Sequence, residues 1–442
     1  MSLENILITA AEFDTPVNHK QLDAFDVWAK HNKGQVYVIP IQGQNSSDLE
    51  LDPRLFNYNV LLNNIHNFSK KLQVRDFRVK AQQINPLTGL RRFGQTNISY
   101  IIGNPKQQLE YAANSTVGYP KMLTSTGVCT QPNYRDNRIG NIGKNDHVQG
   151  GIVVTLDGDK YHFRHIQSTH KGEFVDLGIK YTPLGKLKVD RADTLVVGDL
   201  HDAQTDEKAY EALINQIKYF SPKYIMLHDV FDAQSISYFD IGRSLSRTKK
   251  SIKNKLTLEK ELASLGKRLE HISSNSPSDS KILIVKSNHD EMLDKYLDNM
   301  RFVNEPNNTQ IGVRLSNAVL DKFDPLEEGV KEAYGKIPDK VRFLRRNEEF
   351  KRYGWMLSFH GDKGPGGSRG SMNGLEYSVG KGIVGHTHSA AILRGLYRVG
   401  TLERNDVEYI RGSPSNWTQT NAVIYNNGKA QLINTIDGKW KA

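Results

Sequence analysis

Short apolar segments alternate with amphipathic segments over the second half of the chain. Residues 194–197 form an apolar, β-branched run, and residues 207–219 follow with apolar positions at helical spacing. A stripe of apolar residues between 258 and 272, at steps of four and three, predicts a helix packed on a sheet. Strands that alternate with helices predict a layered α/β fold. Further apolar runs of strand length lie at residues 224–227, 281–286, 355–359 and 382–384.

The first half of the chain has a weaker pattern. A strand is expected at residues 5–9, a helix at 20–33 and a second strand at 35–40, which together make a β-α-β unit. Residues 151–156 and 160–167 flank an Asp-Gly pair and predict a β-hairpin, because Asp-Gly adopts the positive φ angles of a tight turn. We interpret the histidines on and beside this hairpin as ordinary polar residues of a surface hairpin, not as metal ligands.

Length and turn residues predict two domains. At 442 residues the chain is too long for one ordinary core. Pro183 and Gly185 interrupt the pattern shortly before the first apolar run of the second half, so a boundary is expected near residues 182–188. We therefore expect an N-terminal α+β region of unassigned role at 1–185 and an α/β domain at 186–442.

Composition limits the classes of protein and of partner. The formal net charge of +10 supports a polyanionic partner, for which DNA is our expectation. Cys129 is the only cysteine, which excludes an intrachain disulfide and fits a reducing compartment. No apolar run has the length of a membrane span, and an acid stands where a signal peptide carries basic residues. We expect a cytoplasmic protein without a membrane partner, and the oligomeric state is left open.

Five of the apolar runs end at side chains that can bind metal ions. Because ligand sites in layered α/β folds lie at the carboxyl ends of strands, these tips are expected to meet at one edge. A single Asp or His after a strand is more often a turn residue, but five in sequence favour a shared site. The residues at these tips are Asp199 and His201, Asp229, Asn288 with His289 and Asp290, His360, and His386 with His388.

Together these motifs resemble the calcineurin-like metallophosphoesterases. Asp-x-His, Asp-x-x-Asp, Asn-His-Asp, His-Gly and Gly-His-x-His occur in that family's order and approximate spacing over residues 194–423. The resemblance implies a four-layer α/β/β/α core with two divalent metal ions, to which the N-terminal region is an addition. It implies that Asp199, His201, Asp229 and His388 hold one metal, and that Asp229, Asn288, His360 and His386 hold the other.

The resemblance also implies catalytic roles beside the ligands. In the family, the histidine after the asparagine ligand protonates or stabilises the leaving oxygen, and His289 occupies that position. Asp290 is expected to orient the ring of His289. Asp232, in the second motif, is expected either to support a ligand from outside the metal shell or to cap a helix.

This chain departs from the family at two kinds of position. His228 precedes Asp229 and Ser287 precedes Asn288, where the family usually has glycine, so the local backbone geometry is expected to differ. The second motif continues with Ala-Gln instead of the phosphate-binding arginine of Ser/Thr protein phosphatases. The outline is more similar to the DNA-repair exonucleases and to early host-takeover DNases of large tailed phages.

Two segments are candidates for substrate contacts. The glycine-rich residues 361–371 contain Lys363 and Arg369, which would bind a phosphate, with a flexible linker as the alternative. A basic run follows the second motif and predicts a track for a nucleic-acid backbone, with an ordinary solvated helix face as the alternative. Its members are Arg243, Arg247, Lys249 and Lys250.

We expect a phosphodiester hydrolase, a DNA nuclease that uses a hydroxide held between two metal ions. Donors of the Asp, Asn and His types suit Mn²⁺ best, with Fe or Zn²⁺ as alternatives. One competing hypothesis is a phosphatase or phosphodiesterase acting on a small nucleotide, with the N-terminal region as a specificity cap. Another is a non-catalytic scaffold of the same fold, although no ligand is missing here. For a phage protein the compartment would be the host cytoplasm. DNA against RNA, and endo- against exonuclease action, are left open.

Overall fold

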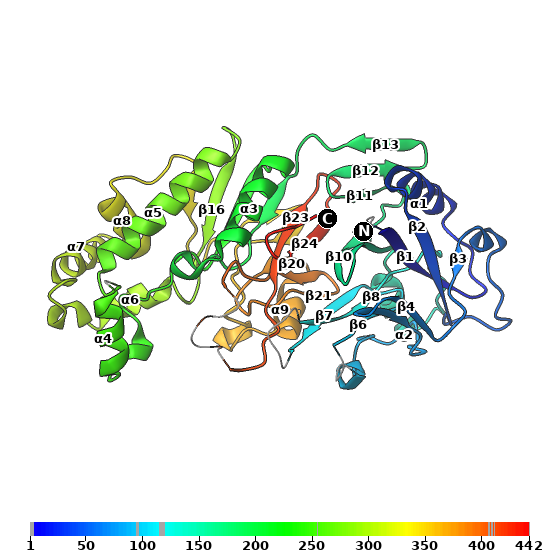
Figure 1. Ribbon diagram of the computed structural model, residues 1–442, viewed down its shortest axis with the longest axis horizontal. Coiled ribbons are helices and arrows are strands. Elements are labelled where there is room, and N and C mark those ends of the chain that lie inside the picture. Colours follow the sequence, from blue (N-terminus) through cyan, green and yellow to red (C-terminus); the bar gives the residue numbers. More distant parts are fainter. Residues whose placement is uncertain are drawn as a thin grey trace.

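The computed structural model describes residues 4–93, 97–114, 120–253, 255–404, 407, 410 and 412–441, and within these ranges the chain is a mixed α/β protein (Figure 1). Its strands form sheets of three, five, six and ten strands. The N-terminal region lies at one end of the molecule and helices α5 to α8 at the other, with the C-terminal strands between them (Figure 1).

The six-stranded sheet contains the parallel strands that the sequence predicts in its second half. Strands β14 to β17 pair in parallel, so their carboxyl ends share one edge, and β23 and β24 continue the sheet in the antiparallel sense. The strands are β14 (Thr194–Val196), β15 (Tyr224–His228), β16 (Lys281–Val285), β17 (Val341–Phe343), β23 (Gln419–Ile424) and β24 (Ala430–Thr435).

Helices cover one face of this sheet. The apolar stripe of α5 is buried against strands and neighbouring helices, which confirms the predicted helix packed on a sheet. The helices on this side are α3 (Glu207–Phe220), α5 (Leu258–Asn275), α6 (Glu291–Asp298), α7 (Thr309–Leu320) and α8 (Pro325–Tyr334). Between α3 and α5 the short helix α4 (Ser244–Ile252) projects from the body (Figure 1).

The ten-stranded sheet joins the two halves of the chain. Leu109 of β7 pairs with Ile392 of β21, so strands from the first 125 residues extend a sheet begun by the second half. The predicted strand at 355–359 is shorter, because its pairing stops at Met356. In spatial order the strands are β18 (Lys351–Arg352), β19 (Trp355–Met356), β20 (Gly382–Val384), β22 (Leu396–Arg398), β21 (Ala391–Leu393), β7 (Gln108–Ala112), β8 (Lys121–Ser125), β6 (Ser99–Ile102), β5 (Leu72–Arg75) and β4 (Ile65–Ser69).

One core lies between the two large sheets. Val196, Met226 and Leu283 of the six-stranded sheet are buried in the same cluster as Ile383 and Tyr397 of the ten-stranded sheet. Helix α9 (Met372–Val379) packs on the outer face of the ten-stranded sheet. In the described part of the chain, no helix combines the length and apolarity that a membrane crossing requires.

The five-stranded sheet contains the predicted β-α-β unit and hairpin. Its strands are β10 (Lys160–Gln167), β9 (Gly150–Asp157), β1 (Glu4–Glu12), β2 (Gln35–Ile41) and β3 (Asn59–Val60), and α1 (His19–Asn32) connects β1 to β2. The expectation of a surface hairpin is wrong for β10, because His162 and His165 are buried. His165 Nε2 lies 2.7 Å from Thr124 Oγ1, and burial lowers the pKa of His165 to about 4, so this histidine is a structural polar residue.

Strands β11, β12 and β13 form the three-stranded sheet. The hairpin of β12 and β13 occupies the segment where the sequence predicts a domain boundary. The bounds of these strands are β11 (Phe174–Asp176), β12 (Ile179–Thr182) and β13 (Gly185–Lys188), and the helix α2 spans Arg138–Asn145.

Candidate metal centre

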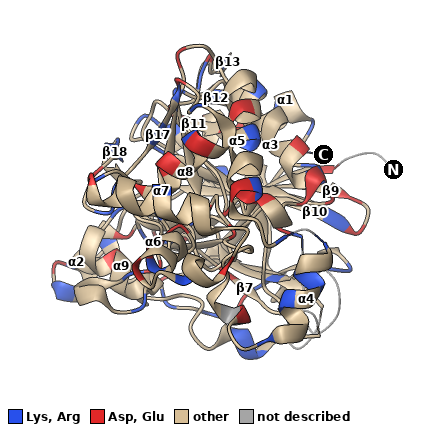
Figure 2. Ribbon diagram, turned by 90° about the vertical axis from the view of Figure 1, so that its left-hand side faces the viewer, with Lys and Arg blue, Asp and Glu red and all other residues tan. Residues whose placement is uncertain are grey.

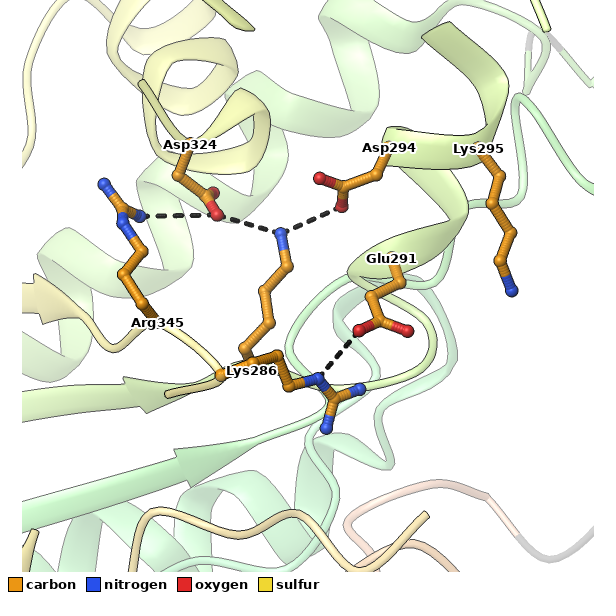
Figure 3. Close-up of a pocket in the computed structure, with 7 residues that line it drawn as sticks. Lys286, Glu291, Asp294, Lys295, Asp324 and Arg345 are labelled. Atoms are coloured by element: carbon orange, nitrogen blue, oxygen red, sulfur yellow. Dashed lines mark hydrogen bonds and ion pairs between the residues drawn. The ribbon is translucent and has the colours of Figure 1, made fainter. Parts of the chain in front are cut away.

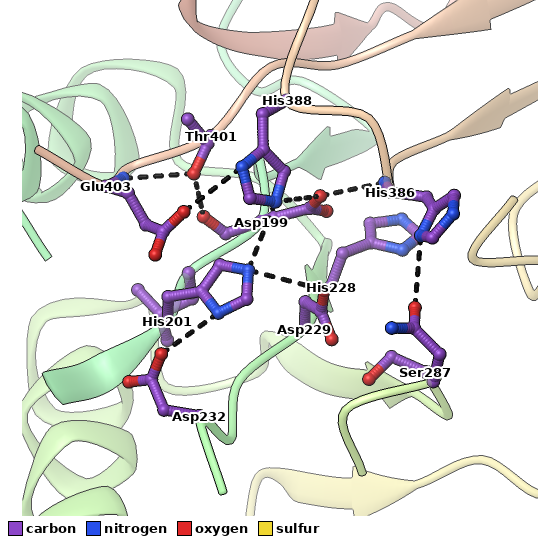
Figure 4. Close-up of polar contacts among 12 residues, drawn as sticks. Asp199, His201, His228, Asp229, Asp232, Ser287, His386, His388, Thr401 and Glu403 are labelled. Atoms are coloured by element: carbon purple, nitrogen blue, oxygen red, sulfur yellow. Dashed lines mark hydrogen bonds and ion pairs between the residues drawn. The ribbon is translucent and has the colours of Figure 1, made fainter. Parts of the chain in front are cut away.

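The polar residues that follow β14, β15, β16, β19 and β20 meet at one edge of the sheet sandwich (Figure 4). The backbone there is unusual. His201, Asp229, His386 and His388 have φ angles of 47°, 47°, 82° and 59°. Non-glycine residues in the left-handed region cost free energy, and such residues cluster where a function requires a fixed side-chain direction. Four of the seven predicted metal ligands are held in this way.

Four donors form a compact group. Ligand atoms of Asp199, His201, Asp229 and His388 lie within 4.8 Å of one another, and all four residues are buried. His201 Nε2 lies 3.3 Å from Asp229 Oδ2, and His388 Nε2 lies 3.3 Å from Asp199 Oδ2. This group has the same members as the first metal site implied by the family resemblance.

The other predicted ligands adjoin this group at Asp229. His360 Nε2 is 3.4 Å from Asp229 Oδ2. His386 Nδ1 is 3.1 Å from Asn288 Oδ1, and the rings of His360 and His386 have centroids 5.3 Å apart. The structure therefore brings all seven predicted ligands together, with Asp229 between the two groups.

The donors have the properties of a site for cations. Among the described residues, Asp199 Oδ1 and Asp229 Oδ1 are buried and have no hydrogen-bond partner. Buried acceptors without partners are costly unless a cation compensates them. A Cβ atom on Gly385 would lie 2.2 Å from Asp199 Oδ1, so glycine keeps this space open for the carboxylate. Carboxylate, amide and imidazole donors suit divalent first-row metals, so the compact group of four fits such an ion.

Two buried carboxylates hold the outer nitrogens of ligand histidines. Asp232 Oδ1 lies 3.1 Å from His201 Nδ1, and Asp232 Oδ2 accepts a hydrogen bond from the Ala203 N–H. Glu403 Oε2 lies 3.1 Å from His388 Nδ1. Such carboxylates fix the tautomer and the direction of a metal-binding imidazole. Of the two roles expected for Asp232, its contacts favour support of a ligand. The sequence did not reveal Glu403, because no motif marks its position after β22.

His228 lies beside the predicted ligand His360, as Asp232 and Glu403 lie beside His201 and His388. Its ring is buried, and the Nδ1 atoms of the two histidines are 3.4 Å apart. Burial and the neighbouring His360 lower the pKa of His228 to about 3. The positive φ angle falls on Asp229 and not on His228, so the chain forms its tight turn one residue later than the family's glycine suggests.

Asp290 contacts its own turn. Its Oδ2 accepts a hydrogen bond of 2.9 Å from the Ser287 N–H, and its own N–H donates to Ser287 Oγ. Within the described contacts Asp290 does not reach His289, whose Nδ1 is buried without a hydrogen-bond partner. Asp290 therefore shapes the turn that carries Asn288, and its expected role in orienting the His289 ring stays a prediction. The His289 ring packs edge-on against His201, with centroids 4.8 Å apart.

Charges within the site are strongly coupled. Burial alone would raise the pKa of Asp229, but His289, His360 and His201 outweigh it and hold this pKa well below its usual value. Burial likewise opposes protonation of His360, yet Asp229 and Asp199 raise its pKa to about 9. The pKa of His201 is raised well above its usual value, where Glu403 and Asp229 outweigh burial. Without metal, protons on histidines therefore balance the carboxylates.

The glycine-rich segment after His360 is held by ion pairs. Lys363 Nζ lies 2.7 Å from Glu291 Oε1, and Arg346 makes a bidentate pair with Asp362 at 2.8 Å. Lys363, predicted to bind phosphate, is therefore already paired with Glu291, whereas Arg369 is exposed.

Two of the four residues of the predicted basic run form ion pairs with acidic residues, and the other two are exposed. Arg247 Nη2 lies 3.1 Å from Glu305 Oε1, and Lys250 is paired with Asp240. Arg243 and Lys249 are exposed. Two of the four predicted contacts therefore hold α4 in place, and two are free to face solvent.

A polar pocket of about 290 Å³ lies behind the third motif (Figure 3). Lys286 Nζ is 2.9 Å from both Asp294 Oδ2 and Asp324 Oδ2, and Arg345 Nη1 is 3.3 Å from Asp324. Burial works against the charge on Lys286, but these carboxylates raise its pKa. Because Lys286 precedes Asn288 by two residues, this network fixes the turn that presents the asparagine.

Comparisons with known proteins give one clear relative in sequence. The chain is 28% identical over 415 residues to Protein A1 of Escherichia phage T5, an alignment that covers 89% of this chain and 73% of that protein. No family model matches the chain. Among solved structures, it is similar to Vps29 of Chaetomium thermophilum, alone and with a cyclic peptide, at 9% identity and a TM-score of 0.24. These alignments cover 41% and 42% of this chain and 99% and 96% of Vps29. A TM-score this low supports no argument about the fold.

Proposed function

We propose that this chain is a di-metal phosphodiester hydrolase that acts on DNA. The observation that carries the proposal is the convergence of seven Asp, Asn and His donors from five strand ends of two sheets, with Asp229 between the two groups. The proposal includes the metallophosphoesterase architecture with its four-layer core, and Mn²⁺ as the native metal.

The metal ions, Asp229 and His289 would have different roles in the reaction. Two bound divalent ions supply Lewis-acid stabilisation of phosphate charge and a water molecule of lowered pKa. Asp229 is the least replaceable residue, because both donor groups share it. His289 is half-buried and turns toward the donor cluster, where its imidazole would give a proton to the leaving oxygen.

Three features favour DNA over a small substrate. Asn288, His289 and His386 are half-buried, so the centre is reached from solvent at this edge. The chain carries a formal net charge of +10, which favours a polyanion. The second motif lacks the arginine of protein phosphatases. The phage relative supports a place in the cytoplasm of an infected host cell.

The test is a substrate panel with controlled metal content. The protein is stripped with a chelator and assayed with Mn²⁺, Mg²⁺, Fe²⁺ or Zn²⁺ on plasmid DNA, linear duplex, single-stranded DNA, RNA and bis-p-nitrophenyl phosphate. We expect DNA cleavage, highest with Mn²⁺ and absent without metal. Hydrolysis of bis-p-nitrophenyl phosphate with intact DNA would support the small-substrate alternative. Failure to bind any metal in a calorimetric titration would support a non-catalytic scaffold.

A further inference from the structure

Helix α4 has its apolar side chains on the outside. Leu245 and Ile252 are each 80% exposed, and no residue of the helix is buried. Positions 245, 248, 249 and 252 share one helix face, so Leu245 and Ile252 lie on either side of Thr248 and Lys249 in one exposed strip. An amphipathic helix normally buries such a strip against the body of the protein.

The polar side of α4 attaches it to the protein. Lys250 pairs with Asp240 and donates a hydrogen bond of 3.1 Å to the Gln234 carbonyl. Ser246 Oγ donates to Asp240 Oδ1 at 2.7 Å. Together with the Arg247 to Glu305 ion pair, these contacts fix the direction of the helix. Leu245 and Ile252 therefore face outward on a helix that ion pairs hold in place, and their exposure is not the result of a loose helix.

Only basic charges accompany the strip. Residues 241–253 contain Arg, Lys and uncharged residues without any Asp or Glu. Arg243, Lys249 and Lys253 are exposed around it, and Ile241, in the preceding turn, is 53% exposed. Figure 2 shows blue Lys and Arg positions along the α4 ribbon. A symmetric contact with a second copy would place these like charges against one another, so the surface fits a polyanion with apolar faces.

The segment that carries α4 begins at the metal centre. Gln234, which anchors Lys250, follows two residues after Asp232, and Asp232 contacts the metal-ligand candidate His201. The Gln234 N–H is fixed in turn by Glu261 Oε1 at 2.8 Å. The segment that leads to α4 therefore starts beside the donor cluster, and its first turn is fixed by these contacts.

We propose that α4 is a DNA-gripping element in which Leu245 and Ile252 contact nucleobases while Arg243 and Lys249 bind the adjoining phosphates. This inference rests on the proposed nuclease function. Nucleic acid is the polyanion whose bases present apolar faces, and proteins insert Leu and Ile between base steps to hold or distort a strand. The cationic side chains supply affinity that does not depend on sequence.

The test compares two pairs of exposed aliphatic residues, one on α4 and one at β13. The variant Leu245→Ser/Ile252→Ser is measured against wild type and against Leu184→Ser/Leu187→Ser, whose leucines are 99% and 65% exposed beside and on β13, at the other end of the molecule (Figure 1). Binding is followed by fluorescence anisotropy with a labelled phosphorothioate duplex and with the matching single strand. We expect the α4 variant to bind at least about tenfold more weakly, as for the loss of two apolar contacts, and the control to bind as wild type.

Salt dependence tests the phosphate contacts. Lys249→Ala should reduce the slope of log affinity against log salt by about one, whereas Lys188→Ala on β13 should leave it unchanged. Both lysines are exposed, so neither change removes a buried contact.

Each alternative has its own result. Unchanged DNA affinity in the α4 variant overturns the inference, as does a parallel loss of calorimetric Mn²⁺ binding, which would show damage to the metal centre. Binding of wild type to anionic phosphatidylglycerol vesicles that disappears in the α4 variant, with DNA affinity retained, assigns the strip to a lipid surface instead. If wild type neither binds nor cleaves DNA but hydrolyses bis-p-nitrophenyl phosphate, the proposed substrate itself is wrong.

Discussion

Two parallel β-α-β units in this protein place carboxylates at strand ends, with opposite outcomes. In the six-stranded sheet, Asp229 is surrounded by histidines that keep its pKa well below the usual value. In the five-stranded sheet, Glu12 ends β1 as a buried side chain whose Oε1 has no hydrogen-bond partner among the residues that the structure describes, and burial raises its pKa to about 7. The one side-chain partner found for it in the described residues is Thr130. A strand-end carboxylate therefore joins a candidate metal site where other elements supply histidines, as at Asp229, and is a protonatable buried group where they do not, as at Glu12.

A neighbouring residue shows a third outcome. Asp14 has a positive φ angle of 54°, like Asp229, but its carboxylate accepts hydrogen bonds from the backbone N–H groups of residues 47–50. These bonds lower the pKa of Asp14 and occupy its oxygens. Backbone strain alone therefore does not indicate a metal site, whereas strain with unpaired buried oxygens does.

The largest effect is expected from Asp229→Asn. The change keeps the shape of the side chain but removes the charge that both donor groups share, so turnover should fall to the level of a metal-free sample. Cleavage assays and calorimetric Mn²⁺ titration measure the two losses. Asp298→Asn on α6, an exposed position, is the control. Full activity in Asp229→Asn would contradict the assignment of Asp229 as the shared ligand.

The next largest effect is expected from His289→Ala. A lost general acid lowers kcat by roughly 10²- to 10⁴-fold, while metal binding should persist because this ring is not among the ligands. Single-turnover kinetics and Mn²⁺ titration separate the two quantities, with the exposed His170→Ala as control. Loss of metal to the same extent as in Asp229→Asn would show that His289 is a ligand.

Changing the pH should affect apo and metal-bound protein in opposite directions. The pKa of His360 is about 9 in the metal-free fold against a usual value of 6.5, so its stabilising charge is fully present below pH 6.5 and is lost as the pH rises through 9. Metal displaces this proton, so metal affinity should rise over the same interval. Thermal unfolding from pH 6.5 to 9 should show a falling apo Tm and a growing shift on addition of Mn²⁺. A metal-induced shift that is constant with pH would contradict the protonated state of His360.

The smallest effect is expected from Glu12→Gln and concerns stability alone. The pKa of Glu12 is raised from 4.5 to about 7, so its stabilising contribution is full below pH 4.5 and is lost as the pH rises through 7. Glutamine removes this loss and should stabilise the protein by roughly 1–3 kcal/mol above pH 7, with little change near pH 4.5. Denaturant unfolding at the two pH values tests this, with the exposed Glu50→Gln as control. An equal effect at both pH values would point to packing instead of charge.

Local patterns in the sequence predicted much of the fold. The apolar runs before Asp199, Asp229 and Asn288 form β14, β15 and β16, and the leucine stripe forms the buried face of α5. These predictions are confirmed because the periodicity of a strand or helix depends only on residues that are close together in the sequence. The pairing of β7 with β21 was not predictable in this way, because its partners lie far apart along the chain and each strand is short.

The sequence by itself determined which residues are available as metal ligands and that they follow strands, since residue type and spacing are local properties. Only the tertiary structure decided which side chains support them: Glu403 behind His388, His228 beside His360, and Ser287 as the partner of Asp290. It also decided that Arg247 and Lys250 anchor α4 while its apolar strip faces solvent. The physical reason is that hydrogen bonds and ion pairs depend on distances of a few ångströms between segments, which no local pattern encodes.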